Sequence, residues 1–404
     1  MAYIFVADDF TGASDTLATL ARCGLRARLF LDVPQADEVD GLDAWGIATH
    51  ARSLDSRSLK ALAVDLGRKL APFRPPFLHV KMCSTFDSSA ETGNIAILAE
   101  ALCQAIGARK LAVIGGQPSL GRFCVFGNLF ARAPDNGVYR IDRHPIMASH
   151  PVTPMREADL SLHFAALGLT GLSRVDRRTS GSGTAFPRLY DVLEQADIAM
   201  IGRELVEEAA PLVVVGASSV AEAWLAGQGI GRAVPQPGLS VDRPILAFAG
   251  SRSSLTASQV AAADGLARHP VSPSDLDPNS RARETIFHWA SERLAGGQDC
   301  LLFLTADSAQ DTTPAILARW SAHLISQILQ QARVGALIVA GGDTSSAVVQ
   351  ELKPRYLEFA GTVCPGVSTL VANLAGHPMP LILKGGQMGD VHFFRDSMRF
   401  LGQN

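Results

Sequence analysis

The amino-acid sequence predicts an α/β fold with two domains, each built on a largely parallel sheet flanked by helices. Short apolar runs recur along the chain, and a helix-like segment follows each of them. The runs are nearly continuous rather than alternating, which is typical of strands buried on both faces of a parallel sheet. In the first half of the chain they occupy residues 4–6, 28–31, 46–48, 77–80, 111–114 and 212–215.

The same alternation of apolar runs and helix-like segments resumes after a turn-rich stretch at residues 233–243. A chain of 404 residues has room for two or three domains at roughly 100–200 residues each. We therefore predict one domain over residues 1–238 and a second over residues 239–404. In the second domain we expect strands at 245–248, 301–304, 336–339 and 380–383, and helices at 257–267 and 314–331.

The composition excludes several classes of protein. The chain has 36 Lys and Arg against 39 Asp and Glu, so it lacks the basic excess of a nonspecific nucleic-acid binder. Its six cysteines form no Cys-x-x-Cys pair and no Cys/His cluster, which favours free thiols over structural zinc. The sequence has neither a signal-like start nor an 18-residue membrane-spanning run. We expect a cytoplasmic protein that binds neither nucleic acid nor membrane.

Two acidic residues follow the first predicted strand. In an open α/β sheet, ligands bind beyond the carboxyl ends of the strands, which is where Asp8 and Asp9 lie. Because adjacent side chains point in different directions, one carboxylate can bind a ligand hydroxyl while the other orients the loop. The alternative interpretation is that one of them only caps the following helix.

The segment after the strand at 77–80 is also polar. Its mixture of a cation, hydroxyls and a carboxylate can hold the carboxylate and hydroxyls of a small ligand. The alternative is a solvated loop that caps a helix starting near Asn94, but a cation directly after an apolar strand favours an anionic ligand. The residues concerned are Lys81, Cys83, Ser84, Thr85 and Asp87.

Other polar residues follow predicted strands or lie between them. Arg52 is a second candidate for contact with an anion, and a surface ion pair is the alternative. Arg122, in the loop after residue 114, is a further candidate for ligand contact. His144 and His150 are six residues apart, and we interpret them as structural or substrate-positioning residues because no other metal-ligand spacing accompanies them.

Three glycine-rich loops lie in the second half, each after a predicted strand. They cover residues 249–256, 340–346 and 385–389. Small residues with free backbone N–H groups at a helix start form an anion site. Three such loops in one domain point to a nucleotide, although neither G-x-x-x-x-G-K-[ST] nor G-x-G-x-x-G is present.

Motifs in both halves resemble the four-carbon acid sugar kinase family. In the first half they are Ala-Asp-Asp-Phe-Thr-Gly-Ala at 7–13, Lys-Met-Cys-Ser-Thr-Phe-Asp-Ser at 81–88 and His-Pro-Val-Thr-Pro-Met at 150–155. In the second half they are Gly250-Ser251, Gly342-Asp343-Thr344-Ser345 and Lys384-Gly385-Gly386. The order is that of the family and covers nearly the whole chain. Two loops depart from the family: Asp343 and Ser346 replace its usual Glu and Gly, and residues 384–389 replace its usual Lys-Ser-Gly-Asn-Phe-Gly.

The resemblance implies an N-terminal sugar-acid-binding domain and a C-terminal ATP-binding domain. It also implies phosphorylation of small acids such as threonate, erythronate, 3-oxo-tetronates or branched relatives. The implied sugar-acid contacts are Asp8, Arg52, Lys81, Cys83, Ser84 and Thr85. The implied ATP contacts are Ser251, Gly342, Asp343, Thr344, Ser345 and Gly385.

Our hypothesis is therefore a kinase that uses ATP and Mg²⁺ to phosphorylate a hydroxyl of a small sugar acid. Lys81 and Arg52 would neutralise the substrate carboxylate, and Asp9 or Asp87 would accept the hydroxyl proton. Backbone N–H groups of the glycine loops would hold the phosphates. The metal ligands are not identified by the sequence, and a homodimer is compatible with it.

Two rival functions remain open. One is a nucleotide-dependent oxidoreductase, against which the missing dinucleotide fingerprint counts. The other is a non-catalytic sugar-acid sensor whose altered ATP loops have lost turnover, against which Lys384 and the glycine loops count.

Overall fold

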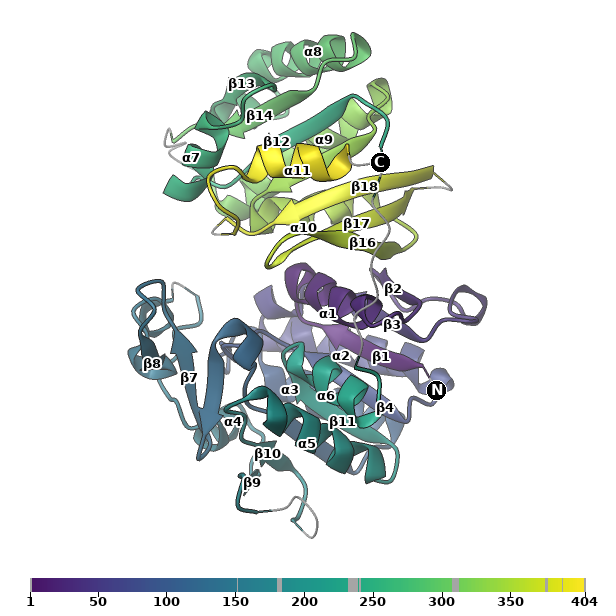
Figure 1. Ribbon diagram of the computed structural model, residues 1–404, viewed down its shortest axis with the longest axis vertical. Helices are drawn as coiled ribbons and strands as arrows, with labels where there is room; N and C mark the ends of the chain where they lie inside the picture. The colour runs from purple at the N-terminus through teal and green to yellow at the C-terminus, as the bar shows by residue number, and fades with distance from the viewer. Residues whose placement is uncertain are drawn as a thin grey trace. The chain divides into compact units, whose positions relative to one another are not determined.

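The structure is a computed structural model that describes residues 2–150, 152–179, 184–231, 239, 241–306, 312–374, 377–386 and 388–402. The chain divides into two compact units, Met1–Val234 and Pro235–Asn404. Each unit has an α/β fold with a mostly parallel sheet, which confirms the predicted fold class (Figure 1). The boundary predicted after residue 238 falls in the stretch 232–238, which lies outside the described residues.

Eight parallel strands form the main sheet of the first unit. The apolar runs of the sequence become its central strands, which are buried almost completely because helices cover both faces. In sheet order the strands are β2 (Ala27–Phe30), β3 (Ala44–Ala48), β1 (Tyr3–Ala7), β4 (Phe77–Lys81), β11 (Leu212–Gly216), β5 (Lys110–Ile114), β10 (Arg188–Tyr190) and β9 (Ser173–Val175).

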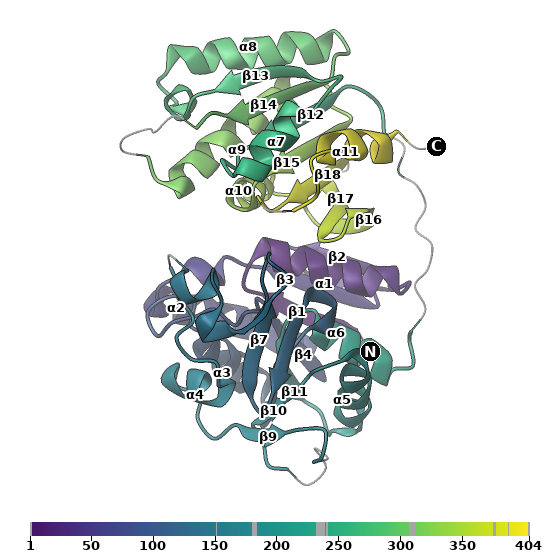
Figure 2. The same ribbon diagram turned by 60° about the vertical axis from the view of Figure 1, so that its left-hand side comes forward.

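Helices cover this sheet in two layers. The pair α5 and α6 packs on one face and the pair α2 and α3 on the other (Figure 2). Polar side chains set the helix starts: α3 begins beside Asn94, as expected, and the Asn94 side chain caps it by accepting from the N–H of Ile97. The helices are α1 (Phe10–Arg22), α2 (Ser56–Leu70), α3 (Ile95–Ile106), α4 (Leu160–Ala166), α5 (Gln195–Glu207) and α6 (Ser219–Gly227).

The first unit also contains a small antiparallel sheet that the sequence did not predict. It consists of β6 (Arg122–Val125), β7 (Asn128–Arg132) and β8 (Val138–Arg140). The strands have only three to five residues, and polar side chains alternate with apolar ones. Such short alternating runs do not stand out beside the long apolar runs of the main sheet.

The sheet of the second unit is parallel at one side and antiparallel at the other. The run from β13 to β18 is parallel, whereas β16, β17 and β18 pair antiparallel in chain order. The sequence predicted only the last of those three strands. In sheet order the strands are β13 (Ala267–Val271), β14 (Cys300–Leu304), β12 (Ile245–Ala249), β15 (Ala336–Ala340), β18 (His377–Lys384), β17 (Val367–Leu374) and β16 (Leu357–Cys364).

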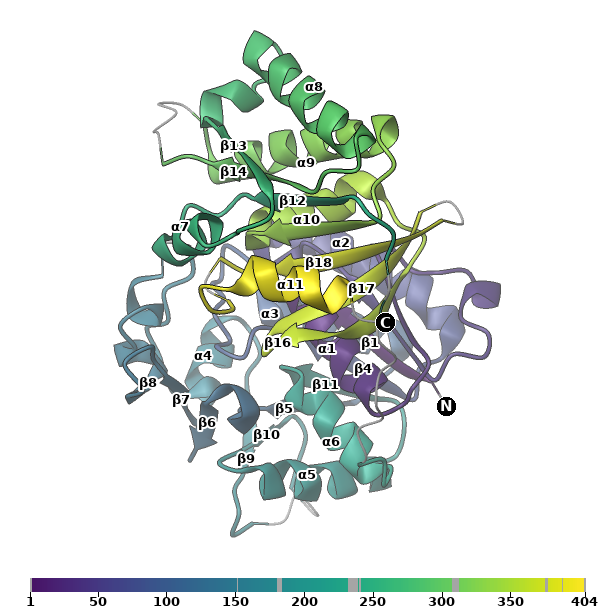
Figure 3. The same cartoon turned by 45° about the horizontal axis from the view of Figure 1, so that its top comes forward.

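Two helices were predicted in the second unit. The bounds of one were correct, and the bounds of the other were wrong. Thr313 caps α9 and Pro314 takes its first position, so the predicted helix 314–331 is confirmed. The predicted helix 257–267 is wrong, because α7 starts earlier, behind its cap Ser253, and ends at Ala261 before the chain turns into β13. Figure 3 shows α7 and α11 in front of the sheet and α9 and α10 behind it. The helices are α7 (Ser254–Ala261), α8 (Arg281–Ala295), α9 (Pro314–Gln331), α10 (Gly342–Leu352) and α11 (Phe393–Leu401).

Helices α5 and α6 approach closely at Gly202, and a side chain there should destabilise the first unit. A Cβ at residue 202 would lie 2.0 Å from the carbonyl oxygen of Ala223, a backbone atom that cannot move aside cheaply. Gly202→Ala should lower the free energy of unfolding by about 1–2 kcal/mol, the overpacking cost exceeding the gain in helix propensity. Urea unfolding measures this. Gly231→Ala, where nothing lies within 4 Å, is the matched control, and equal stabilities of the two variants would contradict the close contact.

Candidate functional site

The polar segments after β1 and β4 lie together at the carboxyl edge of the first sheet. Strand β1 stands between β3 and β4, and the chain visits the β3 side before it crosses to β4. Such a reversal marks the ligand-binding crevice of an open α/β sheet. The N–H of Asp8 donates to the carbonyl of Lys81 over 3.0 Å, so the two segments are direct neighbours.

The guanidinium of Arg52 is engaged by two carboxylates of the same protein. Its Nε and Nη2 donate to the two oxygens of Asp8 over 2.9 and 3.0 Å. Its Nη1 lies 3.0 Å from an oxygen of Asp9. Burial raises the pKa of Asp8, which Arg52 opposes. Burial acts to lower the pKa of Arg52, but the neighbouring Asp8, Cys83 and Asp9 raise it well above its usual value.

Asp9 caps the first helix and faces the amine of Lys81. Its Oδ1 accepts from the N–H of Gly12 over 2.8 Å, which is the capping arrangement weighed as the alternative interpretation. Lys81 is buried and its Nζ donates to the carbonyl of Met82 over 2.7 Å. A Cβ at residue 12 would lie 2.6 Å from both the Asp9 Oδ1 and the Lys81 Nζ. The carboxylate and the amine therefore converge on the first turn of α1.

A chain of hydrogen bonds joins the loop after β4 to the loop at residue 150. The hydroxyl of Thr85 lies 2.5 Å from one oxygen of Asp87 and 2.9 Å from the sulfur of Cys83. The hydroxyl of Thr153 donates to the other oxygen of Asp87 over 3.0 Å and lies 3.2 Å from Nδ1 of His150. Both oxygens of the buried Asp87 are thus occupied. No role was predicted for Thr153, whose only signal in the sequence was its place in the His-Pro-Val-Thr-Pro-Met segment.

The same loop contains a strained residue. Phe86 has φ of 54° although it is bulky, and its ring packs edge-on against Phe164 at a centroid distance of 6.0 Å. Backbone strain of this kind clusters at ligand sites. Ser84 is half-buried and makes no hydrogen bond to the described residues, so its hydroxyl is available to a ligand. Burial raises the pKa of the Cys83 thiol, which keeps it protonated at neutral pH.

The histidines hold loops in place, as predicted. His144 is buried, and its Nδ1 accepts from the N–H of Ile146 over 3.2 Å. His150 accepts from the N–H of Thr153 over 3.1 Å. In the part of the chain that the structure describes, no three His, Cys, Asp or Glu side chains gather as metal ligands.

The three glycine loops of the second unit lie side by side. The N–H groups of Gly250 and Ser251 donate to the carbonyl of Ala340 over 2.9 and 3.0 Å. The N–H of Gly341 donates to the carbonyl of Lys384 over 2.8 Å. Gly341 has φ of 145°, and a Cβ there would lie 3.0 Å from the Ser251 nitrogen. Backbone contact therefore ties together the loops after β12, β15 and β18.

The start of α10 presents backbone donors beside open space. No atom lies within 4 Å of a Cβ built on Gly342. The carboxylate of Asp343 is exposed and has no partner among the described residues. Thr344 is buried against Gly250, and the buried hydroxyl of Ser345 has no hydrogen-bond partner. An uncapped N-terminus of an 11-residue helix is a ready site for an anion.

A buried lysine lies among these loops without a carboxylate to balance it. The side chain of Lys384 is fully buried, and its Nζ donates to the carbonyl of Gly385 over 3.1 Å. The same nitrogen lies 5.3 Å from the ring centroid of Phe393, and no carboxylate of the described residues is within ion-pair distance. Burial lowers the pKa of Lys384 to about 8. The resemblance placed Lys384 in a motif of the nucleotide-binding domain, but no ATP contact was assigned to it, although a lysine directly after an apolar strand was the signal used for Lys81.

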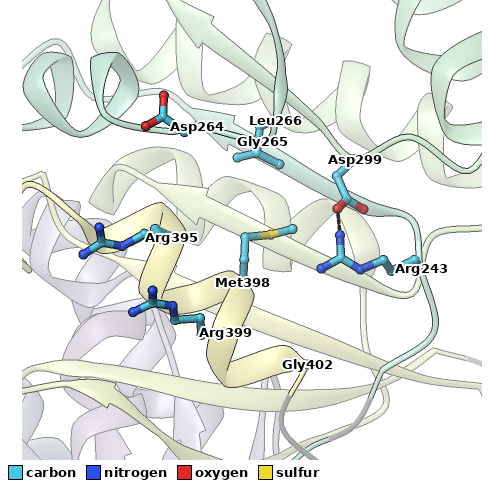
Figure 4. A pocket seen from close by; sticks show the side chains of 9 residues that line it. All are labelled: Arg243, Asp264, Gly265, Leu266, Asp299, Arg395, Met398, Arg399 and Gly402. Atoms are coloured by element: carbon cyan, nitrogen blue, oxygen red, sulfur yellow. Dashed lines mark hydrogen bonds and ion pairs between the residues drawn. The ribbon is translucent and has the colours of Figure 1, made fainter.

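A cavity in the second unit does not coincide with the glycine loops. It has a volume of about 510 Å³, and Arg243 and Asp299 form an ion pair in its wall (Figure 4). Arg243, Leu266 and Asp299 precede β12, β13 and β14, so the cavity lies at the amino edge of the sheet. The glycine loops lie at the carboxyl edge, where α/β sheets bind ligands.

Two family models together match nearly all of the chain. Residues 3–224 match a sugar-binding N-terminal domain, and residues 246–394 match a nucleotide-binding C-terminal domain. The chain belongs to the four-carbon acid sugar kinase family. It is an ATP-dependent kinase of the sugar-acid class, as the motifs of its sequence implied.

Curated relatives with kinase names match over almost their whole length. A 3-oxo-isoapionate kinase of Paraburkholderia graminis is 30% identical, and the match covers 96% of this chain and 92% of that protein. A 3-oxo-tetronate kinase of Cupriavidus necator is also 30% identical, with 98% and 96% covered.

Solved structures share the fold. A protein of Salmonella typhimurium LT2, described as a tRNA synthase, has a TM-score of 0.82 and 25% identity over 99% of each chain. A Haemophilus influenzae protein has a TM-score of 0.76 and 22% identity, with 98% of this chain and all of that chain covered. The synthase name differs from the kinase names, and the latter agree with the two domain models. Among the described helices, none combines the length and the apolar character needed to cross a membrane.

Deprotonation of Lys384 should weaken ATP binding above pH 8. Phosphates favour the charged amine, so a free protein whose lysine has lost its proton must take one up on binding. The Kd for ATP should change little near pH 7, be about doubled at pH 8 and then rise up to about tenfold per pH unit. Calorimetry in that range measures this.

Lys384→Met is the control for this titration. It should bind ATP more weakly and with a flat Kd from pH 7 to 9. It should also be at least as stable as wild type below pH 8, where the buried charge opposes folding, with the difference shrinking as pH rises towards 10.5. An unchanged rise of Kd above pH 8 in Lys384→Met would assign the titration to another group.

Proposed function

We propose that this chain transfers the γ-phosphoryl group of ATP to a hydroxyl of a 3-oxo sugar acid with four carbons or a branched skeleton. Support comes from the names of two relatives, each 30% identical over nearly the whole chain. The observation that best supports nucleotide binding is the burial of Lys384. A buried cation that has no carboxylate partner among the described residues favours a phosphate ligand. Threonate and erythronate are related substrates of the same class.

The nucleotide phosphates would be held mainly by backbone donors. The start of α10 has no side-chain cap, and fixed backbone donors of this kind stabilise phosphoryl charge. The loop after β12 lies beside it, where the N–H groups of Gly250 and Ser251 donate to the carbonyl of Ala340. The ammonium group of Lys384 would add a positive charge next to the phosphates. The proposed ATP contacts are Ser251, Gly342, Asp343, Thr344, Ser345 and Gly385.

The residues of this site fit an Mg²⁺ ion that binds together with the nucleotide. It usually binds through one or two carboxylates together with substrate phosphates. Asp343 is exposed, lies in the first turn of α10 and has no partner among the described residues, so we assign it as the carboxylate donor. Bound there with ATP, the ion would neutralise charge on the phosphates.

The sugar acid would lie at the carboxyl edge of the first sheet. Lys81 offers a buried ammonium group, and the half-buried Ser84 offers a hydroxyl without a protein partner. Thr85 is oriented by Asp87 and can accept a hydrogen bond from a ligand hydroxyl. The proposed contacts are Asp8, Lys81, Cys83, Ser84 and Thr85, whereas Arg52, the sixth expected contact, holds Asp8 and Asp9 through its three nitrogens.

Two carboxylates are candidates for the acceptor of the hydroxyl proton. Asp9 lies at the end of β1 and faces the amine of Lys81. Asp87 is held by the hydroxyls of Thr85 and Thr153, so it would act after release of one of these hydrogen bonds. General bases of this kind contribute about 10²–10⁴-fold to a rate.

An ADP-release assay against a panel of sugar acids tests the proposed reaction. The panel contains threonate, erythronate, 3-oxo-tetronate and branched 3-oxo acids, with ATP and Mg²⁺. We expect acid-dependent ADP release for at least one 3-oxo acid, and phosphorus NMR should show a phosphate ester. ATP without acid is the control. An acid that binds without any turnover would contradict the kinase and support a sensor instead.

Replacing the two carboxylates should identify the proton acceptor. Asparagine also caps helices, so Asp9→Asn should retain the start of α1, and Asp87→Asn retains an oxygen for Thr85. The variant that removes the acceptor should lose about 10²–10⁴-fold in kcat, and the other less than about tenfold. Steady-state kinetics and the melting temperature are measured together. Wild-type kcat in both variants would exclude both carboxylates from proton transfer.

A further inference from the structure

The charges after β1, β3 and β4 do not favour an anionic substrate. Asp8, Asp9 and Asp87 supply three carboxylates, and Arg52 and Lys81 supply two cations. Arg52 already pairs with the first two carboxylates through all three of its nitrogens. A substrate carboxylate would add a fourth negative charge to a buried site, which is costly without another cation. The first unit must therefore supply one from elsewhere.

Arg122 is a cation that the protein leaves without an anion. It begins β6, and its Nη1 donates to the carbonyl of Leu120 over 2.8 Å and lies 3.5 Å from the carbonyl of Arg132. Its Nε is buried without any hydrogen-bond partner, and no carboxylate of the described residues lies within ion-pair distance. Burial lowers the pKa of Arg122, the opposite of the direction at Arg52, where carboxylates raise it. A buried donor without a partner is unfavourable unless a ligand satisfies it.

Arg122 belongs to the same edge of the sheet as the polar site. Strand β5 ends at Ile114, and the loop that follows leads directly into β6. Only β11 separates β5 from β4, so the loops after β4 and β5 lie about 10 Å apart at the usual strand spacing. The thiol of Cys83 is close enough to interact electrostatically with both Arg122 and Arg52.

Gln117 adds an unsatisfied acceptor beside this cation. Its N–H donates to the carbonyl of Arg122 over 2.9 Å, and the N–H of Arg122 donates back over 3.1 Å. The Gln117 side chain is 3% exposed, yet its Oε1 has no hydrogen-bond partner. Among the described residues, one turn of the chain thus presents a guanidinium without a carboxylate partner and an amide oxygen without a hydrogen-bond partner.

We propose that Arg122 binds the carboxylate of the sugar acid and that Gln117 accepts a hydrogen bond from the adjacent hydroxyl. A guanidinium can hold a carboxylate through two parallel hydrogen bonds, which also fixes the direction of the substrate. Arg52 then acts as a positioning residue that holds Asp8 and Asp9 in place. The inference deepens the proposed function and rests on it for the chemical class of the ligand.

Glutamine variants of the two arginines separate these roles. Arg122→Gln removes a buried cation without an anion, so the melting temperature should stay the same or rise. Its KM for the sugar acid should rise about 10–150-fold, with the Kd for ATP unchanged. Arg52→Gln leaves Asp8 and Asp9 without their partner, so its melting temperature should fall. Arg143→Gln, an arginine with an 80% exposed side chain in the same unit, is the matched control and should match wild type.

Two measurements distinguish a ligand contact from a merely structural arginine. Calorimetry with erythronate should show the loss of affinity in Arg122→Gln, whereas its neutral analogue erythritol should bind wild type and variant equally. Guanidinium ion at a non-denaturing concentration should partly restore the acid affinity of Arg122→Ala. Equal weakening towards erythronate and erythritol, with no rescue, would mean that Arg122 only shapes the loop, and it would overturn the inference.

Failure of this inference is distinct from failure of the kinase proposal. A wild-type protein that binds erythronate but phosphorylates no acid would contradict the kinase, while the calorimetric comparison would still decide the role of Arg122. An active enzyme whose Arg122→Gln variant keeps its KM within about twofold would overturn the inference alone. A wild-type protein that binds no acid would overturn both.

Discussion

The ion pair of Arg52 with Asp8 and Asp9 is the interaction on which the arrangement of charges at the end of β1 depends. It places two carboxylates at the end of β1 and neutralises them with one guanidinium through three contacts of 2.9–3.0 Å. Breaking one partner of such a buried set leaves an uncompensated charge, which is far more costly than losing a surface pair. The pair thus fixes the geometry of α1 and its loop, and it commits Arg52 to the protein rather than to the substrate.

Both units contain a cation that their own carboxylates do not balance. In the first unit it is Arg122, whose Nε has no hydrogen-bond partner among the described residues, and in the second it is Lys384, whose amine donates to the carbonyl of Gly385. Burial moves the pKa of each below its usual value. Burying a cation without a carboxylate partner is unfavourable, and it is typical of sites where an anionic ligand pairs with the cation. The same principle therefore underlies the proposed carboxylate site of one unit and the proposed phosphate site of the other.

The sequence predicted the parallel strands well and the antiparallel ones poorly. A continuous apolar run such as residues 336–339 indicates a strand whose two faces are both buried. Central strands of a parallel sheet are buried in this way. The small sheet of β6 to β8 and the strands β16 and β17 have mixed polarity and lack that signal. Helix 314–331 was predicted at its bounds because a cap and a proline mark its start, whereas α7 has no proline to fix its position.

The sequence named candidate site residues but not their contacts. Motifs at strand ends named Asp8, Lys81 and the glycine loops, because strand direction alone brings those ends to one edge. The sequence did not separate the task of Arg52 from that of Arg122. Two arginines near strand ends look alike in a sequence, and only their partners distinguish them.

By itself, the sequence determined the fold class, the strand-end segments and the family, because these depend on local polarity and on motifs of a few residues. The tertiary structure decided which charges are paired. Arg52 meets Asp8 across 44 positions of the chain and Thr153 meets Asp87 across 66, contacts that arise only when the strand order is set. Pairing depends on distances of about 3 Å between side chains from different loops, and no local pattern encodes such distances.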